Sequence, residues 1–436
     1  MAAKAPKKIV IRAYNVGFGD CLLVSFVYTG AIRTRHVLID CGSTRAPEAK
    51  KNNKDFMQEI VADITQVCGG KLDAIVATHR HRDHISGFGK ETGPALAALK
   101  PDVVIQPWTE DPDAPEDELA PVNDPGTAGK FQAVAQFRRS LDDMHAMAGH
   151  VAAFARARRT TRPVLSKQLE FLGEGNVKNL EAVKNLMEMA PNKYVYFGSK
   201  HGLEKLLPGV KTLVLGPPTL KQTDTIRRQV DKNDDEFWHL YRGFTSFWSF
   251  QVATAEGSGR GRLFRGVKGR APQPSERWLV DRLRKLQDDS ILSIVTALDQ
   301  QMNNTSVILL FETGGKRLLF PGDAQLENWL YALSALEKAG QISMIEKVDF
   351  YKVGHHGSLN ATPMSLWNRF KKKGADGKLQ TVLSTRGGVH GSTARSTEVP
   401  RRTLVAELEA RTALQRTDTI KATDKELCKV IEISLS

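Results

Sequence analysis

The sequence contains few cysteines and no long apolar segment. Its four cysteines in 436 residues are Cys21, Cys41, Cys68 and Cys428, and no two of them form a CxxC pair. This excludes a disulfide-rich scaffold and indicates a reducing compartment. No apolar run approaches the ~20 residues that span a bilayer, and no signal-peptide pattern follows the basic N-terminus MAAKAPKK. We therefore expect a cytoplasmic protein that does not enter a membrane.

Basic residues outnumber acidic residues in this chain. It contains 62 Lys and Arg against 49 Asp and Glu, which gives a formal net charge of +13. A basic excess is typical of proteins that bind polyanions, so nucleic acid is the expected partner, although charge alone is weak evidence. The length allows one large domain with insertions or two domains. We interpret residues 1–436 as a single domain with two insertions.

Four potential metal ligands lie within six positions: His79, His81, Asp83 and His84. They follow a short apolar run that is typical of a buried strand. On an extended segment His79 and His81 point the same way, because side chains alternate along a strand. Imidazole nitrogens and carboxylate oxygens are ligands that Zn²⁺ accepts. The spacing predicts one ion on the His79/His81 pair and a second on Asp83/His84.

Further candidate ligands follow apolar strands elsewhere in the chain. They are Asp40, Asp323 in a Pro-Gly-Asp turn, the adjacent pair His355 and His356, and His390 in a Gly-rich loop. A carboxylate can bridge two cations with one oxygen for each, which is the role expected of Asp323. Taken alone, Asp323 is better explained as a turn residue or helix cap, and His390 as a solvated loop residue.

The pair His355 and His356 lies in the segment KVGHHGS at residues 352–358. Adjacent side chains point apart, so we expect at most one of the two to bind metal directly. The other would support that ligand or donate a proton. Ser358 is expected to hydrogen-bond a substrate phosphate or to cap the next helix.

Apolar strand-like runs alternate with helical spacing over most of the sequence, and there are no internal repeats. This alternation predicts an α/β fold. The expected strands are 9–13, 21–27, 35–39, 72–77, 103–105, 210–215, 307–312, 317–320, 348–353, 382–385 and 429–434, and the expected helices are 56–67 and 179–190.

The first interruption of this pattern covers residues 109–200. It opens with an acidic, Pro-rich stretch, Thr109 to Gly126, that is expected to be an irregular loop. Residues 134–155 then carry apolar side chains at alternating spacings of three and four, which predicts one long helix with a narrow apolar seam. The favoured interpretation is packing against the same chain, and the alternative is a homodimer or partner interface.

The second interruption covers residues 219–290. It is rich in aromatic residues over 237–250 and in Arg, Lys and Gly over 256–285. Such segments can contact phosphates and stack on bases. A disordered loop followed by an ordinary amphipathic helix explains them equally well. The candidate substrate-binding residues are Arg260, Arg262, Arg265, Lys268 and Arg270.

The order of the candidate ligands resembles the metallo-β-lactamase superfamily. That superfamily has an early Asp, a His-x-His-x-Asp-His segment, a Gly-Asp turn and a final His. Here these are Asp40, residues 79–84, Gly322-Asp323 and His390. The resemblance implies an αββα sandwich, with helical and basic insertions, that binds two divalent metal ions, Zn²⁺ or Mn²⁺.

The resemblance also implies a role for each ligand. Asp40 would orient a ligand histidine from behind. The superfamily's middle histidine has no clear counterpart here, and His355 is the candidate to replace it. The implied assignment is Asp323 as the bridge, His79 and His81 on one ion, and Asp83, His84 and His390 on the other.

The closer resemblance is to the C-terminal hydrolase domain of ComEC-type competence proteins and their free-standing relatives. It rests on the segments NVGFGDC at 15–21, NNTS at 303–306 and KVGHHGS at 352–358, which occur in the same order. No competence-type membrane channel is present, so the resemblance does not imply a role in DNA uptake.

These features favour a dinuclear metal-dependent hydrolase, a phosphodiesterase or nuclease. The residues expected to take part in catalysis are Asp40, Asp83, His355 and His356. The helical insertion also suggests a nuclease that is inactive until a partner protein binds, as in a bacterial conflict or antiviral defence system. The alternatives are a hydrolase of a small molecule, such as a cyclic nucleotide, phosphoester or lactone, and a regulatory interaction subunit.

Overall fold

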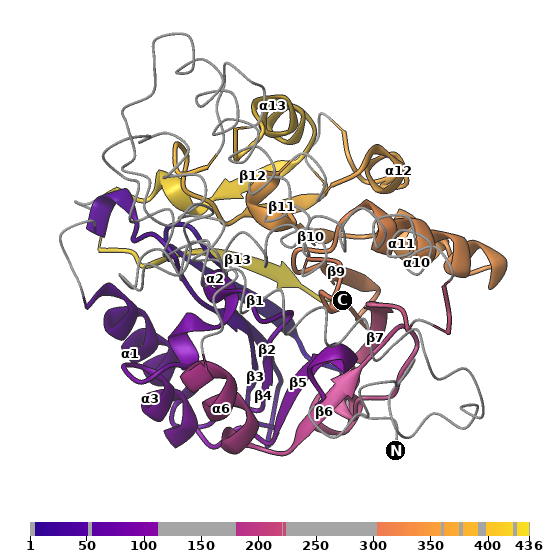
Figure 1. Cartoon of the computed structure of the whole chain (residues 1–436). Coiled ribbons are helices and arrows are strands. Elements are labelled where there is room, and N and C mark those ends of the chain that lie inside the picture. Colours follow the sequence, from indigo (N-terminus) through magenta and orange to yellow (C-terminus); the bar gives the residue numbers. More distant parts are fainter. Residues whose placement is uncertain are drawn as a thin grey trace, which may run out of the picture.

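Two mixed β-sheets with helices on their outer faces make up the described part of the protein (Figure 1). The structure is a computed structural model, and it describes residues 5–50, 55–111, 180–219, 221–223, 303–358, 362–374, 378–390, 398–421 and 425–435. The α/β prediction is therefore confirmed. The predicted helix at 134–155, the aromatic segment at 237–250 and the basic residues from Arg260 to Arg270 lie outside the described residues.

The first sheet is formed mainly by the N-terminal half of the chain. Its strand order is β13-β1-β2-β3-β4-β5-β6. Strands β13, β1, β2 and β3 pair antiparallel, whereas β3, β4, β5 and β6 pair parallel. The strands are β1 Lys8–Tyr14, β2 Cys21–Val27, β3 Arg35–Cys41, β4 Ala74–Val76, β5 Val103–Pro107, β6 Asn192–Val195 and β13 Cys428–Ser434.

The second sheet has the order β12-β11-β10-β9-β8-β7. Its first four strands pair parallel, and β9, β8 and β7 pair antiparallel. The strands are β7 Lys211–Gly216, β8 Ile308–Thr313, β9 Lys316–Phe320, β10 Phe350–Lys352, β11 Gln380–Leu383 and β12 Ala413–Arg416.

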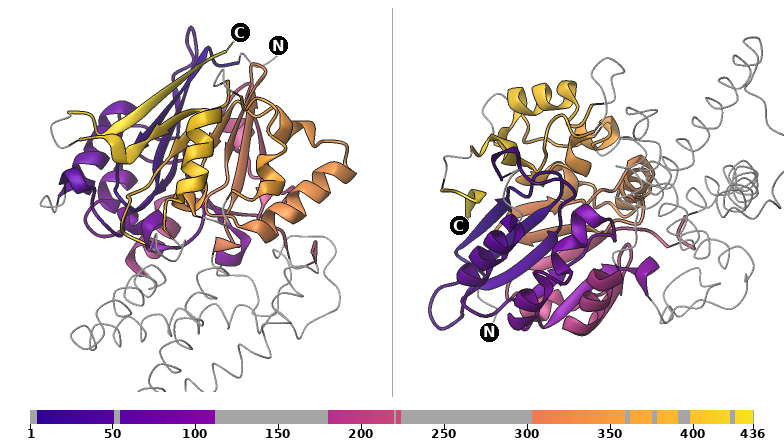
Figure 2. Two further views of the ribbon diagram at one scale, coloured as in Figure 1. Left: turned by 90° about the horizontal axis from the view of Figure 1, so that it is seen from above. Right: turned by 60° about the vertical axis from the view of Figure 1, so that its left-hand side comes forward.

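Helices cover the outer face of each sheet (Figure 2). Helices α1, α3 and α6 pack on the first sheet, and α10 to α13 pack on the second. The helices are α1 Phe56–Cys68, α2 Arg82–Ile85, α3 Gly93–Ala98, α6 Leu180–Met189, α7 Leu203–Leu206, α10 Leu326–Lys338, α11 Ser343–Glu346, α12 Met364–Trp367 and α13 Arg402–Arg411, with short 3-10 turns at 48–50, 86–88, 108–110, 355–357 and 417–419.

Alternation of side chains along the strands explains this layering. In β3, Val37 and Ile39 belong to the apolar core between the sheets, whereas Leu38 faces α1 and its neighbours. In β8, Leu309 enters the central core and Leu310 faces the helices of the second sheet. Strands covered on both faces read as continuous apolar runs, which is why the sequence predicts most of them.

Two strands were not predicted, and both lie at sheet edges. In β6 (NKYV) only Val195 is buried, and β12 (ALQR) has no fully buried residue. Because both segments are largely polar or exposed, neither forms the apolar run that indicates a strand. The segment assigned to the first insertion also requires a correction at its C-terminal end. Residues 180–195 contribute α6 and β6 to the first sheet and its helical layer.

Among the described helices, none is long and apolar enough to cross a membrane. The parallel strands of each sheet run in one direction, and this direction determines where a ligand site can form. The residues after their carboxyl ends therefore meet along one edge, which is where ligand sites of α/β folds are found.

Candidate metal centre

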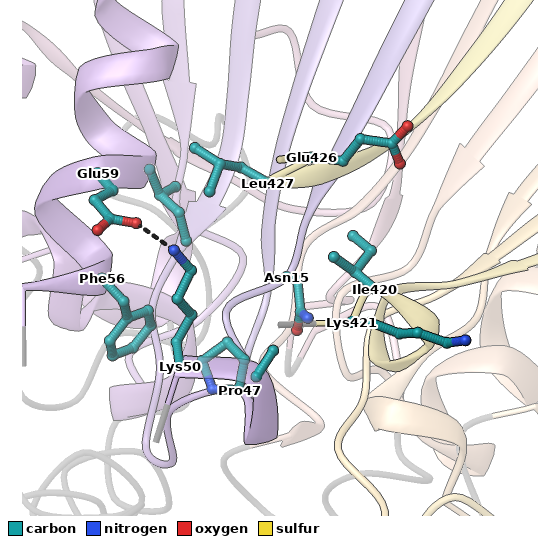
Figure 3. A pocket seen from close by; sticks show the side chains of 11 residues that line it. Asn15, Pro47, Lys50, Phe56, Glu59, Ile420, Lys421, Glu426 and Leu427 are labelled. Atoms are coloured by element: carbon teal, nitrogen blue, oxygen red, sulfur yellow. Dashed lines mark hydrogen bonds and ion pairs between the residues drawn. The ribbon is translucent and has the colours of Figure 1, made fainter. Parts of the chain in front are cut away.

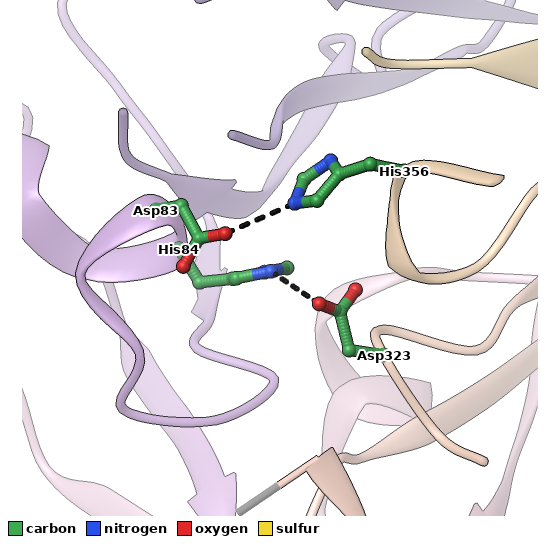
Figure 4. A group of neighbouring side chains, drawn as sticks. All are labelled: Asp83, His84, Asp323 and His356. Atoms are coloured by element: carbon green, nitrogen blue, oxygen red, sulfur yellow. Dashed lines mark hydrogen bonds and ion pairs between the residues drawn. The ribbon is translucent and has the colours of Figure 1, made fainter. Parts of the chain in front are cut away.

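Three of the predicted ligands, Asp83, His84 and Asp323, come together with His356 where the two sheets meet (Figure 4). Asp83 and His84 lie on α2, just after β4, and Asp323 and His356 follow β9 and β10. One ligand atom from each of the four lies within 4.8 Å of every other, and all four side chains are buried. We call Asp83, His84, Asp323 and His356 the four-residue group.

His84 is oriented from behind by Asp40. The His84 Nδ1 lies 2.7 Å from Asp40 Oδ2, and a carboxylate oxygen can only accept, so Nδ1 carries the proton. The Thr78 amide and hydroxyl both donate to Asp40, each at 2.7 Å. This chain of contacts directs His84 Nε2 toward Asp323 Oδ2, 3.0 Å away. It matches the orienting role predicted for Asp40.

His356 is oriented in the same manner by a carbonyl. Its Nδ1 donates to the Ser384 carbonyl oxygen at 3.1 Å, and its Nε2 lies 3.0 Å from Asp83 Oδ2. The ring also packs against Phe18, with 4.3 Å between centroids. Both histidines of the four-residue group therefore present Nε2 to its centre.

This geometry fits a divalent metal ion. Donor atoms around a tetrahedral ion with bonds of 2.0–2.2 Å lie roughly 3.3 Å apart. The 3.0 Å pairs His84–Asp323 and His356–Asp83 are near that separation. Two imidazoles and two carboxylates form a donor set that Zn²⁺ and Mn²⁺ both accept. The ring nitrogens that face away from the group are held by acceptors, as ligating histidines require.

The electrostatics of the four-residue group are those of a site built for positive charge. Burial alone would lower the pKa of His84, but the Asp323 and Asp40 carboxylates outweigh it and hold this pKa well above its ordinary value. Burial alone would raise the pKa of Asp323, and the positive charge of His84 and His355 instead lowers it. The hydrogen bond from His356 likewise lowers the pKa of Asp83, so both carboxylates of the four-residue group stay ionised inside the protein, whereas burial raises the pKa of Asp40.

His79 and His81 form a separate pair beside the group. His79 Nε2 lies 2.9 Å from His81 Nδ1, as their predicted common orientation requires, and 4.0 Å from Asp323 Oδ2. Burial, together with His84 and His81, holds the pKa of His79 well below its ordinary value. Among the described residues, neither histidine belongs to a cluster of three or more ligands.

His355 lies at the margin of the group rather than in it. Its side chain is 21% exposed, and its Nε2 lies 4.0 Å from Asp323 Oδ2. Its Nδ1 lies 2.8 Å from Ser358 Oγ, and Asn303 Nδ2 lies 3.4 Å from Nε2. Ser358 therefore contacts a histidine of the centre, a contact that the predicted phosphate or capping roles did not include.

His390 does not join Asp83 and His84, and His356 takes the place that was predicted for it. His390 instead lines a cleft of about 570 Å³ together with Glu398, Pro400, Arg402, Glu409 and Arg416. The cleft adjoins the centre, because the Arg401 amide donates to the Gly357 carbonyl at 2.8 Å, one residue after His356.

A second, much smaller pocket has a volume of about 20 Å³ and is lined by residues that include Lys50 and Glu59 (Figure 3). It is large enough only for a water molecule.

Three residues of the centre have left-handed backbone conformations. The φ angles of Asp40, His355 and His356 are 56°, 40° and 52°. Such angles are uncommon for residues with a Cβ and are found at functional sites. In the 355–357 turn they redirect the two adjacent histidines, so that His356 enters the group while His355 faces the margin.

Several residues of the centre were not predicted from the sequence. Thr78 holds Asp40, and Ser384 holds His356. The Ser306 hydroxyl accepts the Asp323 amide proton at 3.2 Å, which places the NNTS segment beneath the centre. Asp20 and Lys352 form a buried ion pair next to the group. Thr78 and Ser384 carry no sequence signal of their own, whereas Ser306, Asp20 and Lys352 belong to the segments that carried the ComEC-type resemblance.

The other two histidines within the described residues have packing roles. His36 and His201 are buried, with their rings against Ser25 and Thr212. Comparison with known proteins adds no assignment, since no protein-family model and no curated protein matches this sequence.

Proposed function

We propose that this protein is a metal-dependent phosphodiesterase that acts on nucleic acid, built on the αββα fold of the metallo-β-lactamase superfamily. The observation that carries the proposal is the four-residue group. Two carboxylates and two histidines, each histidine fixed by an acceptor on Nδ1, converge at ligand distance between the carboxyl ends of parallel strands. Structural ion pairs do not require this common orientation of both Nε2 atoms.

The proposal includes two ions with different binding sites. The four-residue group would hold one of them, and His79, His81 and Asp323 would hold the second. Divalent ions in such a site supply Lewis acidity, activating water and stabilising charge on phosphoryl oxygens. Asp323 Oδ2 faces both positions, at 3.0 Å from His84 Nε2 and 4.0 Å from His79 Nε2.

His355 is the side chain placed to protonate the leaving oxygen. It is partly exposed at the margin of the centre, and Ser358 holds its Nδ1 at 2.8 Å. The ring can hold a transferable proton on Nε2, the atom that faces the centre, when the Ser358 hydroxyl donates to Nδ1 and the Asn303 amide turns its oxygen rather than its nitrogen toward Nε2. His356 is committed to Asp83 and Ser384, so the proton donor of the pair is His355.

The nucleic-acid substrate is supported by the net charge of +13. The direct test is cleavage of plasmid, single-stranded DNA and RNA by protein loaded with Mn²⁺ or Zn²⁺. Asp83→Ala and His84→Ala should abolish cleavage, while His201→Gln, a buried histidine outside the centre, should retain it. Absence of cleavage of all three polymers by metal-loaded wild type would refute the nuclease assignment.

A small phosphoester is the second candidate substrate, and the cleft favours it. Its volume of about 570 Å³ lies within the range of small-molecule sites. Salt separates the two candidates. Cleavage of a polyanion should weaken steeply with salt through counterion release, whereas hydrolysis of a cyclic nucleotide should change little.

A further inference from the structure

A buried ion pair joins the two sheets directly beside the four-residue group. Lys352 ends β10 in the second sheet, and Asp20 precedes β2 in the first. The Lys352 ammonium donates to Asp20 Oδ2, and the two side chains are 2% and 0% exposed. Among the lysine and arginine ion pairs of the described residues, only those made by Lys352 join two fully buried side chains.

Asp20 is fixed to the half of the group that the first sheet supplies. Its amide donates to the Asp83 carbonyl at 2.9 Å, and its own carbonyl accepts the Gly42 amide at the same distance. The backbone at Gly19, just before Asp20, packs closely against Gly42, since a Cβ on Gly19 would lie 2.2 Å from the Gly42 carbonyl oxygen. Asp20 therefore moves with Asp83 and α2.

Lys352 is fixed to the half that the second sheet supplies. Its Nζ lies 4.0 Å from Asp323 Oδ1, and its backbone precedes His356 by only four residues. A further contact crosses the same seam, because the Ser384 hydroxyl donates to the Gly19 carbonyl at 2.7 Å. Ser384 is also the residue whose carbonyl orients His356. The ion pair thus spans the seam across which the four ligands face one another.

We propose that Lys352 and Asp20 are positioning residues that hold the two halves of the four-residue group at ligand distance. The inference rests on the proposed function only in requiring that the group binds a divalent ion. Neither residue needs to touch that ion. Asp20, Asp40 and His84 also lie close enough to form a ligand cluster, but the ammonium of Lys352 already neutralises Asp20 there.

A simple counter-charge is the competing role, and it predicts the opposite sign. The carboxylates of Asp20, Asp40 and Asp323 are all buried near Lys352. If Lys352 only balanced their charge, its removal would leave the centre more negative and would tighten binding of a cation. If it holds the halves together, its removal weakens binding, because supporting contacts of metal ligands are worth roughly 10–100-fold in affinity.

The experiment measures Co²⁺ binding by calorimetry and by the absorption spectrum of the bound ion. The variants are Lys352→Met and Asp20→Asn. Lys316→Met is the matched control, since Lys316 is a lysine of the second sheet that pairs with Asp349 at 3.3 Å, away from the group. We expect roughly 10–100-fold weaker binding and an altered spectrum for both test variants, and unchanged binding and spectrum for the control.

The double variant Asp20→Asn/Lys352→Met keeps the test decisive if Lys352→Met alone does not fold, because it removes both charges and leaves no unpaired buried ion. The net charge of the centre is then unchanged, so a counter-charge role predicts wild-type binding, whereas the positioning role predicts weaker binding. Unchanged or tighter binding in the folded variants, with the wild-type spectrum, would overturn the positioning role, even if their thermal stability falls. Wild-type protein that binds no Co²⁺ would instead refute the proposed function, and this inference with it.

Discussion

The four-residue group and the His79/His81 pair lie side by side, yet their surroundings differ. His84 lies between two carboxylates, which hold its pKa well above its ordinary value. His79 is buried, and its burial together with the neighbouring His84 and His81 holds its pKa well below its ordinary value. The group offers four ligands with both imidazoles fixed from behind, whereas the pair offers two histidines and the more distant Asp323.

This difference shows that the residues of a compact His-x-His-x-Asp-His segment can have unequal surroundings. Affinity depends on the number of ligands and on the contacts that orient them. By both criteria the four-residue group is the better site. We therefore expect one tightly bound ion there and a second, weaker ion at His79 and His81.

The largest effect is expected from removing a ligand of the group. His84→Ala leaves Asp40 and Asp323 buried without their shared histidine and removes one of the four candidate metal ligands. Phosphodiester cleavage should fall by at least roughly 10³-fold, equivalent to about 4 kcal/mol of transition-state stabilisation. Two measurements on the same protein samples check this: the single-turnover rate of cleavage and the amount of bound metal. A variant that keeps its tight ion and its activity would remove the distinction between the two sites.

A smaller effect is expected at the residue behind His84. Asp40→Asn retains the size of the side chain but loses the charge that fixes the His84 tautomer. Zn²⁺ affinity should fall by roughly 10–100-fold. Competition with a chromophoric chelator measures this directly. Wild-type affinity in Asp40→Asn would contradict the view that orientation from behind distinguishes the group.

His36 offers a comparison with a buried histidine outside the centre. Burial lowers the pKa of His36 from 6.5 to about 4. The unfolded chain therefore binds the proton more readily, so this histidine costs stability as the pH falls below its ordinary pKa. Between about pH 7 and pH 5 the cost should be about 2 kcal/mol.

Denaturant unfolding of metal-free wild type and His36→Gln at both pH values tests this. The decrease in the free energy of unfolding from pH 7 to pH 5 should be about 2 kcal/mol smaller in His36→Gln than in wild type. Equal losses in the two proteins would show that His36 is not held neutral by burial.

The smallest effect on the tight ion is expected from the neighbouring pair. His79→Ala should lower the number of bound ions by one while changing the affinity of the first ion by roughly threefold or less, below 0.7 kcal/mol. Metal analysis after gel filtration at graded Zn²⁺ concentrations gives both quantities. Loss of the tightly bound ion in His79→Ala would show that His79 and His81, rather than the four-residue group, form the site of higher metal affinity.

Much of the centre could be predicted from the sequence, because its ligands follow apolar strands whose carboxyl ends share an edge. This reasoning identified His84, Asp323 and Asp40 correctly as neighbours. The assignment of His390 to the ion at Asp83 and His84 was wrong, because His356 enters that position through left-handed backbone angles in the 355–357 turn. The same reasoning also missed Asp20 and Lys352, whose pairing depends on how two sheets from distant parts of the chain meet.

The two missed edge strands have a different cause. β6 and β12 each have one side without a pairing strand, and their side chains are largely polar or exposed. Alternation of apolar residues is therefore weak in both. Their places in the sheets are set by backbone pairing with β5 and β11, which local sequence does not encode.

Anomalous diffraction from crystals grown with a limiting amount of Zn²⁺ tests the central claim most directly. The predicted result is a single dominant peak at roughly 2.0–2.2 Å from His84 Nε2, His356 Nε2 and the carboxylates of Asp83 and Asp323. A dominant peak at His79 and His81, with none in the four-residue group, would contradict it.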